Sequence, residues 1–202
     1  MCPMLTSRRA IDALAVALCL SLFGGPSASF ELISRDDWGA NAATLPLKQH
    51  TPVRITIHHT AVGQNHARDI TRKLRALQSF SQSDELLANG HRKEAWADIP
   101  YHFYIDAEGA IAEGRQVHFV GDTNTDYDPT GHIGVVLEGN FDHEQPGEEQ
   151  KKSLGQLLIF LTSEHGIPAD NIGYHKGFAA TACPGENLIA ALPRILERVR
   201  GQ

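Results

Sequence analysis

Cysteines, basic clusters and long apolar runs are all scarce in this sequence of 202 residues. Of its three cysteines, Cys2 and Cys19 lie within the first 29 residues, so Cys183 stands alone in residues 30–202. A lone thiol excludes an internal disulfide there and leaves metal binding as one use for the side chain. Lys and Arg total 18 against 24 Asp and Glu, which gives a net charge of −6. Because no basic block is present, we expect no nucleic-acid partner.

The first 29 residues differ in composition from the rest of the chain. Arg8 and Arg9 precede an apolar run over residues 13–23, and small residues fill positions 24–29. This order is typical of a secretory signal peptide, and the run is too short to span a membrane. A buried core helix is the alternative, which the flanking arginines disfavour. We therefore expect cleavage near Ser29 and a periplasmic or secreted protein. We also expect that the mature chain has no membrane anchor and that residues 30–202 form a single domain.

Hydrophobic periodicity predicts strands that alternate with helices. In the strand over residues 53–58, Val53, Ile55 and Ile57 share one face, and His58 lies on the other. Further strands are expected over residues 101–105, 110–115 and 133–137 and around residue 172, and helices over residues 65–87, 148–165 and 186–199. Pro193 should kink or split the last helix. The pattern predicts an α/β fold, a central mixed β-sheet with helices on both faces, but not the strand order.

Two pairs of residues that can bind a metal lie at a strand end and around a loop. His58 and His59 end the first strand, where a sheet presents side chains to a cleft, and His175 and Cys183 flank a loop rich in glycine and alanine. Two imidazoles and one thiolate would form a catalytic zinc site with a fourth position open for water. A buried cysteine and packed histidines are an equally good interpretation of the spacing alone. The polar loop over residues 121–131 is long enough to suggest a function as well.

Several short motifs occur in an order that resembles one enzyme family. They are Ile-Thr-Ile-His-His-Thr-Ala (55–61), Asp-Ile-Pro-Tyr-His-Phe (98–103), Asp-Ala-Glu-Gly (106–109), Glu-Gly-Arg (113–115), His-Ile-Gly-Val-Val-Leu-Glu-Gly-Asn (132–140) and Cys-Pro-Gly (183–185). Together they resemble the zinc N-acetylmuramoyl-L-alanine amidases of the type 2 amidase family, which share their fold with peptidoglycan recognition proteins and phage T7 lysozyme. The resemblance extends from about residue 32 to about residue 190.

The resemblance implies that zinc is the cofactor and that His58, His175 and Cys183 bind it. The strand motif of the family selects His58 rather than His59 as the ligand. The pleat agrees with this choice, because His58 and Ile57 point to opposite faces of the strand.

The same resemblance implies roles for further side chains. Tyr101 matches a tyrosine whose hydroxyl lies beside the zinc-bound water, and Thr181 matches a threonine of the active recognition proteins. Candidate substrate contacts are His59, Thr60, Trp96 and His118, and Arg115 is a further candidate for the groove. Ordinary packing or surface positions are the alternative for each of these contacts.

Two positions depart from the family pattern. The cytoplasmic-type amidases place a glutamate where this chain has Val136, and Glu138 follows two residues later. Glu138 is therefore either a displaced base or a solvated carboxylate at a strand end, and we favour the second interpretation. The helical Phe-His pair of the recognition proteins is Phe80-Ser81 here, which leaves part of the substrate groove undefined.

The implied activity is hydrolysis of the amide bond between N-acetylmuramic acid and the L-alanine of peptidoglycan by a zinc-activated water. The expected partner is peptidoglycan or soluble muropeptides, bound by a monomer. A non-catalytic peptidoglycan-binding module is the main alternative, and a zinc hydrolase for another amide is the second. The sequence does not indicate whether the third stem residue is diaminopimelate or lysine.

Overall fold

A six-stranded sheet forms the centre of the computed structural model, which describes residues 30–86, 90 and 92–201. The strand order is β1 (Leu32–Ile33), β6 (Ile111–Glu113), β5 (Phe103–Ile105), β7 (His132–Leu137), β2 (Arg54–His59) and β8 (Ile172–Tyr174). Strands β5 and β6 are antiparallel, and the other neighbours run parallel. The expected mixed sheet is confirmed. The expected signal peptide, residues 1–29, lies outside the described residues.

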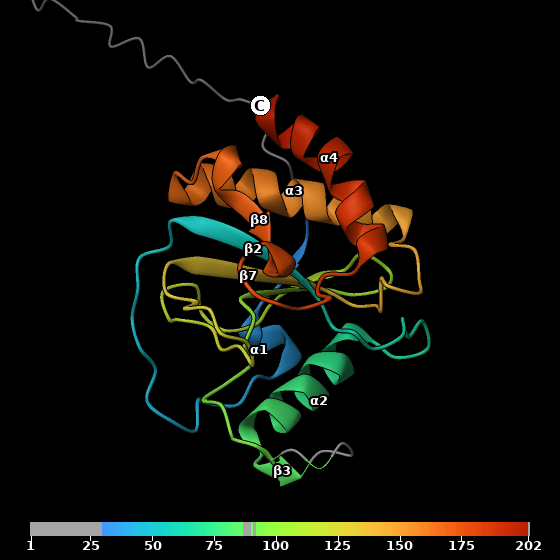
Figure 1. The fold of residues 1–202 in the computed structure, drawn as a ribbon. Helices are drawn as coiled ribbons and strands as arrows, with labels where there is room; N and C mark the ends of the chain where they lie inside the picture. Colours follow the sequence, from blue (N-terminus) through green and yellow to red (C-terminus); the bar gives the residue numbers. More distant parts are fainter. Residues whose placement is uncertain (1–29, 87–89, 91, 202) are drawn as a thin grey trace, which may run out of the picture.

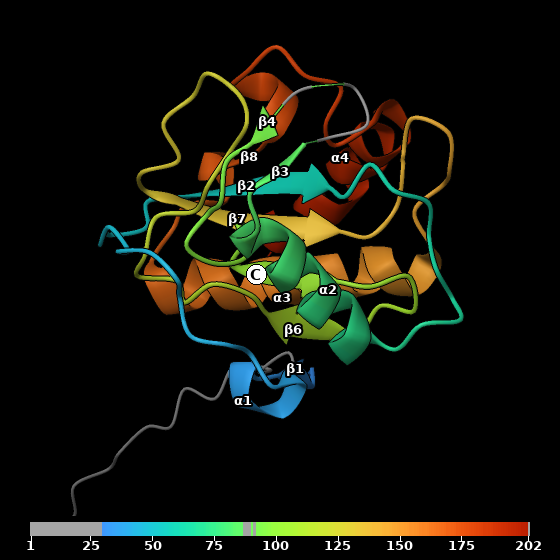
Figure 2. The same cartoon turned by 90° about the horizontal axis from the view of Figure 1, so that it is seen from below.

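Helices cover both faces of the sheet (Figure 1). α3 (Glu148–His165) and α4 (Glu186–Arg200) lie on one face, and α1 (Arg35–Trp38) and α2 (Ile70–Gln82) on the other. The view from below shows α2 in front of the second face (Figure 2). After α2, β3 (Glu85–Leu86) and β4 (Arg92–Lys93) pair as a separate antiparallel ribbon. None of the helices in the described ranges has the length and apolar character that a membrane crossing requires.

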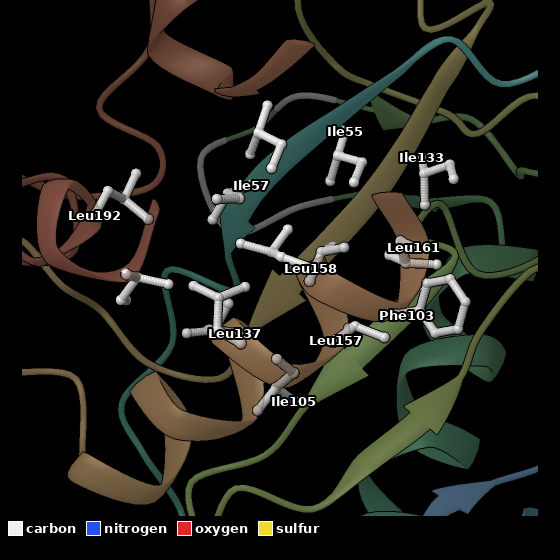
Figure 3. Close-up of a cluster of buried hydrophobic side chains, with 14 of the residues drawn as sticks. Ile55, Ile57, Phe103, Ile105, Ile133, Leu137, Leu157, Leu158, Leu161 and Leu192 are labelled. Carbon is white, nitrogen blue, oxygen red and sulfur yellow. The ribbon is translucent and has the colours of Figure 1, made fainter. Parts of the chain in front are cut away.

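Strand β2 has the two faces that its alternation predicts. Ile55 and Ile57 are fully buried against α3 and α4, where they meet residues such as Leu158 (Figure 3). His58 lies on the opposite face, with its ring centroid 5.1 Å from that of Tyr101. Val53 was also expected on the buried face, but it precedes β2 and is 53% exposed. The alternation within β2 therefore places Ile55 and Ile57 in the core and His58 on the opposite face of the sheet.

Helix α2 is shorter than the apolar pattern predicts. It begins at Ile70 because the side chain of Asp69 accepts a backbone N–H of the first turn and caps the helix. It ends at Gln82, where the Lys93 ammonium donates to carbonyl oxygens of Ser81 and Ser83 at 2.9 and 2.8 Å. Near this end of the helix the Phe80 side chain is 42% exposed.

Helix α4 runs without a break through Pro193, so the expected split does not occur. Leu188 before the proline and Ile195 after it are both buried in the core beneath α4. Apolar packing on both sides keeps the two halves in one helix despite the backbone donor that proline lacks.

Two stacked histidines, His50 and His102, join the segment that follows β6 to the first part of β7. The Nδ1 atom of His102 accepts the Gly134 N–H at 2.8 Å, and its Nε2 contacts the Phe119 carbonyl oxygen at 2.8 Å. His50 makes the same kind of bridge, from the Gly131 N–H at 2.7 Å to a carbonyl oxygen at 2.8 Å. One nitrogen of each ring must accept and the other donate, so both imidazoles are neutral. Burial lowers the pKa of His50 and lowers that of His102 to about 3.

We expect acid to destabilise the protein through these histidines. The unfolded His102 binds a proton near pH 6.5, whereas the folded one binds it only near pH 3. Between these values the unfolded state carries more protons, so the stabilisation is complete above the upper value and falls as the pH falls. The expected loss is roughly 1 kcal/mol per pH unit for this one group. Urea unfolding at about pH 7 and about pH 5 measures it, and His102→Gln should show a shallower pH dependence. Equal dependence in both proteins would contradict the assignment.

Candidate metal centre

Three potential metal ligands from separate segments meet at one end of the sheet. His58 lies near the end of β2, and His175 follows β8 at the start of the short helix η2 (His175–Gly177). Strands β2 and β8 are parallel neighbours, with Ile57 beside Tyr174. The next residue of each strand is a histidine, so the two imidazoles emerge side by side, with ring centroids 4.6 Å apart.

The loop before α4 adds the third potential ligand, Cys183. Its carbonyl oxygen accepts the Lys176 N–H at 2.8 Å, and its Sγ accepts the His59 N–H at 3.3 Å. These bonds place Sγ at 3.7 Å from the Nδ1 of His58. The ligating atoms of His58, His175 and Cys183 all lie within 4.8 Å of one another.

This arrangement fits a zinc ion. With Zn–S of about 2.3 Å and Zn–N of about 2.0–2.1 Å, a tetrahedral ion separates its sulfur and nitrogen ligands by about 3.6 Å. The observed 3.7 Å between Cys183 and His58 agrees with this separation. Two nitrogens and one sulfur form a catalytic type of zinc site, because a fourth position stays open.

The protonation states favour metal binding over chemistry by the cysteine itself. Burial, and then the neighbouring His175, hold the pKa of His58 well below its usual value, so this imidazole is neutral. Burial raises the pKa of the Cys183 thiol to about 12. A nucleophilic cysteine needs a lowered pKa, which this site does not provide. A metal cation bound here would place a positive charge beside the sulfur and so stabilise its thiolate form.

The three residues line a cavity of about 360 Å³, and Tyr101, Thr181 and Trp96 also form part of its wall. A second cavity of about 450 Å³ lies beside it and extends along α2. Both cavities share Thr60, Trp96, Pro100, Tyr101 and Asn124 in their walls. The two cavities therefore adjoin each other at these residues, and together they are called the groove.

Both residues expected to assist catalysis line the first cavity. Burial, followed by the proximity of Cys183, raises the pKa of Tyr101 far above neutrality, so its hydroxyl keeps the proton and can donate it in a hydrogen bond. The Thr181 hydroxyl accepts the Cys183 N–H at 3.2 Å. This bond fixes the turn that carries the thiol and leaves the hydroxyl proton of Thr181 available.

The expected substrate contacts separate into two groups. His59, Thr60 and Trp96 line the cavity, although the Thr60 hydroxyl also bonds to the backbone of Gly139. His118 is exposed on a turn and is not among the residues that line either part of the groove.

Arg115, a further candidate for the groove, is not among the residues that line either cavity. It is 3% exposed and donates to the carbonyl oxygens of Ile99 and Asp98 at 2.9 and 3.0 Å. These bonds, and an ion pair with Asp122, give it a structural role.

Glu138 is not the solvated carboxylate that the sequence suggests. It is 5% exposed, and its Oε2 lies 2.7 Å from the Nζ of Lys73. Its two oxygens also accept backbone N–H groups of Asn65 and Ala107 at 3.1 and 2.8 Å. Asp106 lies 3.4 Å from the same ammonium. These partners favour an anchoring role over that of a base.

Removal of the Lys73 charge is expected to destabilise the fold. Lys73→Met leaves two buried carboxylates without a cation, which costs about 3–5 kcal/mol of unfolding free energy. Urea unfolding measures this loss. Lys152→Met is the matched control, because Lys152 forms an exposed pair with Glu149 and its removal should change the free energy by less than about 1 kcal/mol. Equal stabilities of the two variants would refute the anchoring role.

Thr125 is a site residue that sequence reasoning did not single out. Its hydroxyl lies 2.6 Å from the Nε2 of His175. It belongs to the polar loop over residues 121–131, whose length was the only signal in the sequence.

Sequence comparison places the chain among proteins that act on or recognise peptidoglycan. The model of a family described as N-acetylmuramoyl-L-alanine amidase matches residues 48–186. Peptidoglycan-recognition protein SD of Drosophila simulans is 30% identical over 174 residues, which cover 80% of this chain and 83% of that protein. N-acetylmuramoyl-L-alanine amidase of Sus scrofa is 28% identical over 174 residues, which cover 81% of this chain but only 27% of that protein.

Solved structures give the same result for the fold. The crystal structure of Drosophila peptidoglycan recognition protein SD matches with a TM-score of 0.71 and 26% identity, and covers 82% of this chain and 95% of that chain. A mutant of Drosophila PGRP-LB in complex with tracheal cytotoxin matches with a TM-score of 0.65 and 28% identity, over 80% of this chain and 92% of that chain. The expected fold, with its mixed sheet between two layers of helices, is thereby confirmed.

Proposed function

The chain belongs to the N-acetylmuramoyl-L-alanine amidase family, and on this premise we propose that it hydrolyses the amide bond between N-acetylmuramic acid and the L-alanine of peptidoglycan. The observation that carries the proposal is the convergence of His58, His175 and Cys183 beside Tyr101 in one cavity. We propose that these three side chains bind one zinc ion and that residues 30–202 form a single catalytic domain.

Zinc at this position would supply a Lewis acid that polarises the scissile carbonyl and acidifies the attacking water. The protein supplies the other contributions. Because His58 and His175 are neutral, a zinc ion with one thiolate ligand would keep a net positive charge. This charge would stabilise the negative charge that develops on the carbonyl oxygen. The groove past Trp96 orients the substrate and positions its amide at the open end of the three-ligand set.

Tyr101 and Thr181 stabilise the reacting oxygen atoms in this proposal. The buried Tyr101 hydroxyl remains protonated at neutral pH, so it donates a hydrogen bond to the oxygen on which negative charge develops. The Thr181 hydroxyl, already held by the Cys183 N–H, has its own proton free for the substrate. His59, Thr60 and Trp96 are the proposed substrate contacts, since they line the same cavity.

A non-catalytic peptidoglycan-binding module is the second candidate. It is favoured by the similarity to peptidoglycan-recognition protein SD, which is 30% identical. A binding module needs the groove but not the three ligands, whereas hydrolysis needs both. The retention of His58, His175 and Cys183 at zinc-compatible spacing supports the enzyme.

We further propose that the substrate is peptidoglycan or a soluble muropeptide. A structural neighbour was solved in complex with tracheal cytotoxin, and the groove of this chain lies beside the metal centre. An exported monomer, periplasmic or secreted, fits such a substrate.

Incubation of the purified protein with muropeptides, followed by mass spectrometry, tests this proposal. We expect free stem peptides that begin at L-alanine, their loss after treatment with a zinc chelator, and their return after zinc is added. Retention of intact muropeptides on a zinc-loaded protein would exclude hydrolysis of these substrates and favour the binding module. Chelator-resistant cleavage would exclude the zinc mechanism.

A further inference from the structure

The loop over residues 121–131 contacts the metal centre from outside the set of three ligands. Within it, the Thr125 Oγ1 lies 2.6 Å from the Nε2 of His175. The Tyr127 ring contacts the same imidazole at a tilt of 56°, with centroids 5.2 Å apart, and the centroid of the His58 ring is 4.6 Å from that of His175. The orientation of the His175 ring is therefore set by three neighbours, of which only Thr125 forms a hydrogen bond with it.

We propose that Thr125 is a positioning residue, which fixes the His175 tautomer so that Nδ1 presents its lone pair to the metal. This inference rests on the proposed zinc centre. A histidine has two ring nitrogens, and in the neutral ring only one of them carries hydrogen. If Nε2 donates its hydrogen to the Thr125 hydroxyl, Nδ1 is unprotonated and is free to act as a ligand.

A second contact is compatible with this direction of the hydrogen bond. Thr125 Oγ1 lies 2.8 Å from the hydroxyl of Thr123, and the Thr125 N–H donates to that same Thr123 oxygen at 3.2 Å. When the Thr125 hydroxyl donates its own hydrogen to Thr123, its lone pairs face the imidazole. It then acts as an acceptor toward His175. A chain of two threonines thus performs the role that a carboxylate or carbonyl oxygen commonly has beside zinc-bound histidines.

The loop is held firmly enough for this role. Its first part is tied by the Asp122 N–H, which donates to the Pro100 carbonyl oxygen at 3.3 Å, and by the ion pair between Asp122 and the buried Arg115. Its last part is tied by the Gly131 N–H, which donates to the Nδ1 of His50 at 2.7 Å. Thr125 therefore approaches His175 from a segment that is fixed on both sides.

Zinc affinity of matched variants tests the inference, measured by competition with a chromogenic chelator. Thr125→Val keeps the shape of the side chain but removes the acceptor, and the Kd for zinc should rise about 10- to 100-fold. Thr125→Ser restores the hydroxyl and should bind zinc within about threefold of the unchanged protein. Equal affinity of Thr125→Val and the unchanged protein would overturn the inference, as would a Thr125→Ser variant as weak as Thr125→Val.

A second measurement does not depend on the folding of a variant. In the zinc-loaded protein, nitrogen-15 NMR should find His175 with hydrogen on Nε2 and none on Nδ1, and hydrogen on Nδ1 would overturn the inference. If the unchanged protein binds no zinc, both the metal centre and this inference are wrong. If it binds zinc with the predicted variant order but cleaves no muropeptide, the amidase proposal fails and the positioning role of Thr125 stands.

Discussion

Cys183→Ser should remove both zinc binding and hydrolysis. Serine has nearly the shape of cysteine and can still accept the His59 N–H that now bonds to Sγ at 3.3 Å, so the loop should keep its conformation. Its hydroxyl is a poor ligand at neutral pH, because zinc sites use thiolates, imidazoles and carboxylates. Loss of the metal removes several kcal/mol of transition-state stabilisation, so we expect the rate to fall about 1000-fold or more.

Zinc content measured on the same samples separates two explanations for a lost rate. If Cys183 is a ligand, Cys183→Ser loses zinc and activity together. If the thiol were a nucleophile, the variant would lose activity but retain its zinc, and the ligand assignment would be wrong. His118→Ala is the control, because His118 is exposed and outside the groove. It should keep both properties.

Tyr101→Phe should lower the turnover rate while zinc remains bound. The substitution removes only the hydroxyl, whose proton is retained because burial raises the pKa of Tyr101 far above neutrality. Loss of one donor to a developing oxyanion costs about 100- to 1000-fold in kcat. KM should change little, since the donor acts mainly on the transition state. Steady-state kinetics on a defined muropeptide, with zinc content determined in parallel, measures the effect.

The matched control for this variant is Tyr174→Phe. Tyr174 lies on β8 and lines a separate cavity between that strand and α4, so its hydroxyl is away from the metal centre. The control should keep kcat within about threefold. A Tyr101→Phe variant as active as this control would contradict the proposed role of the hydroxyl.

The sequence predicts the central part of the fold because strand alternation is a local pattern, whereas the set of three ligands is implied only by the resemblance to a family. Alternation along β2 places His58 on the face opposite Ile57, and the structure agrees. The structure also brings His175 and Cys183 to the same place, within 4.8 Å of His58. Parallel pairing of β2 with β8 explains this convergence, and that pairing cannot be inferred from either strand by itself.

Features that depend on distant partners were not predictable from the sequence. Glu138 looks like an exposed strand end until Lys73, which lies 65 positions away, is found 2.7 Å from it. Thr125 gains its importance only because His175, 50 positions away, lies 2.6 Å from its hydroxyl. His118 follows the groove motifs in sequence, but it is not among the residues that line the two cavities.

Titration of the metal-free protein with zinc tests the central claim most directly. The release of peptides that begin at L-alanine would be followed as zinc is added to the chelator-treated protein. With His58, His175 and Cys183 as a single site, the rate should rise in proportion to added zinc and reach its maximum at one equivalent. A rate that is already maximal without zinc, or that stays at zero after one equivalent is bound, would contradict the account.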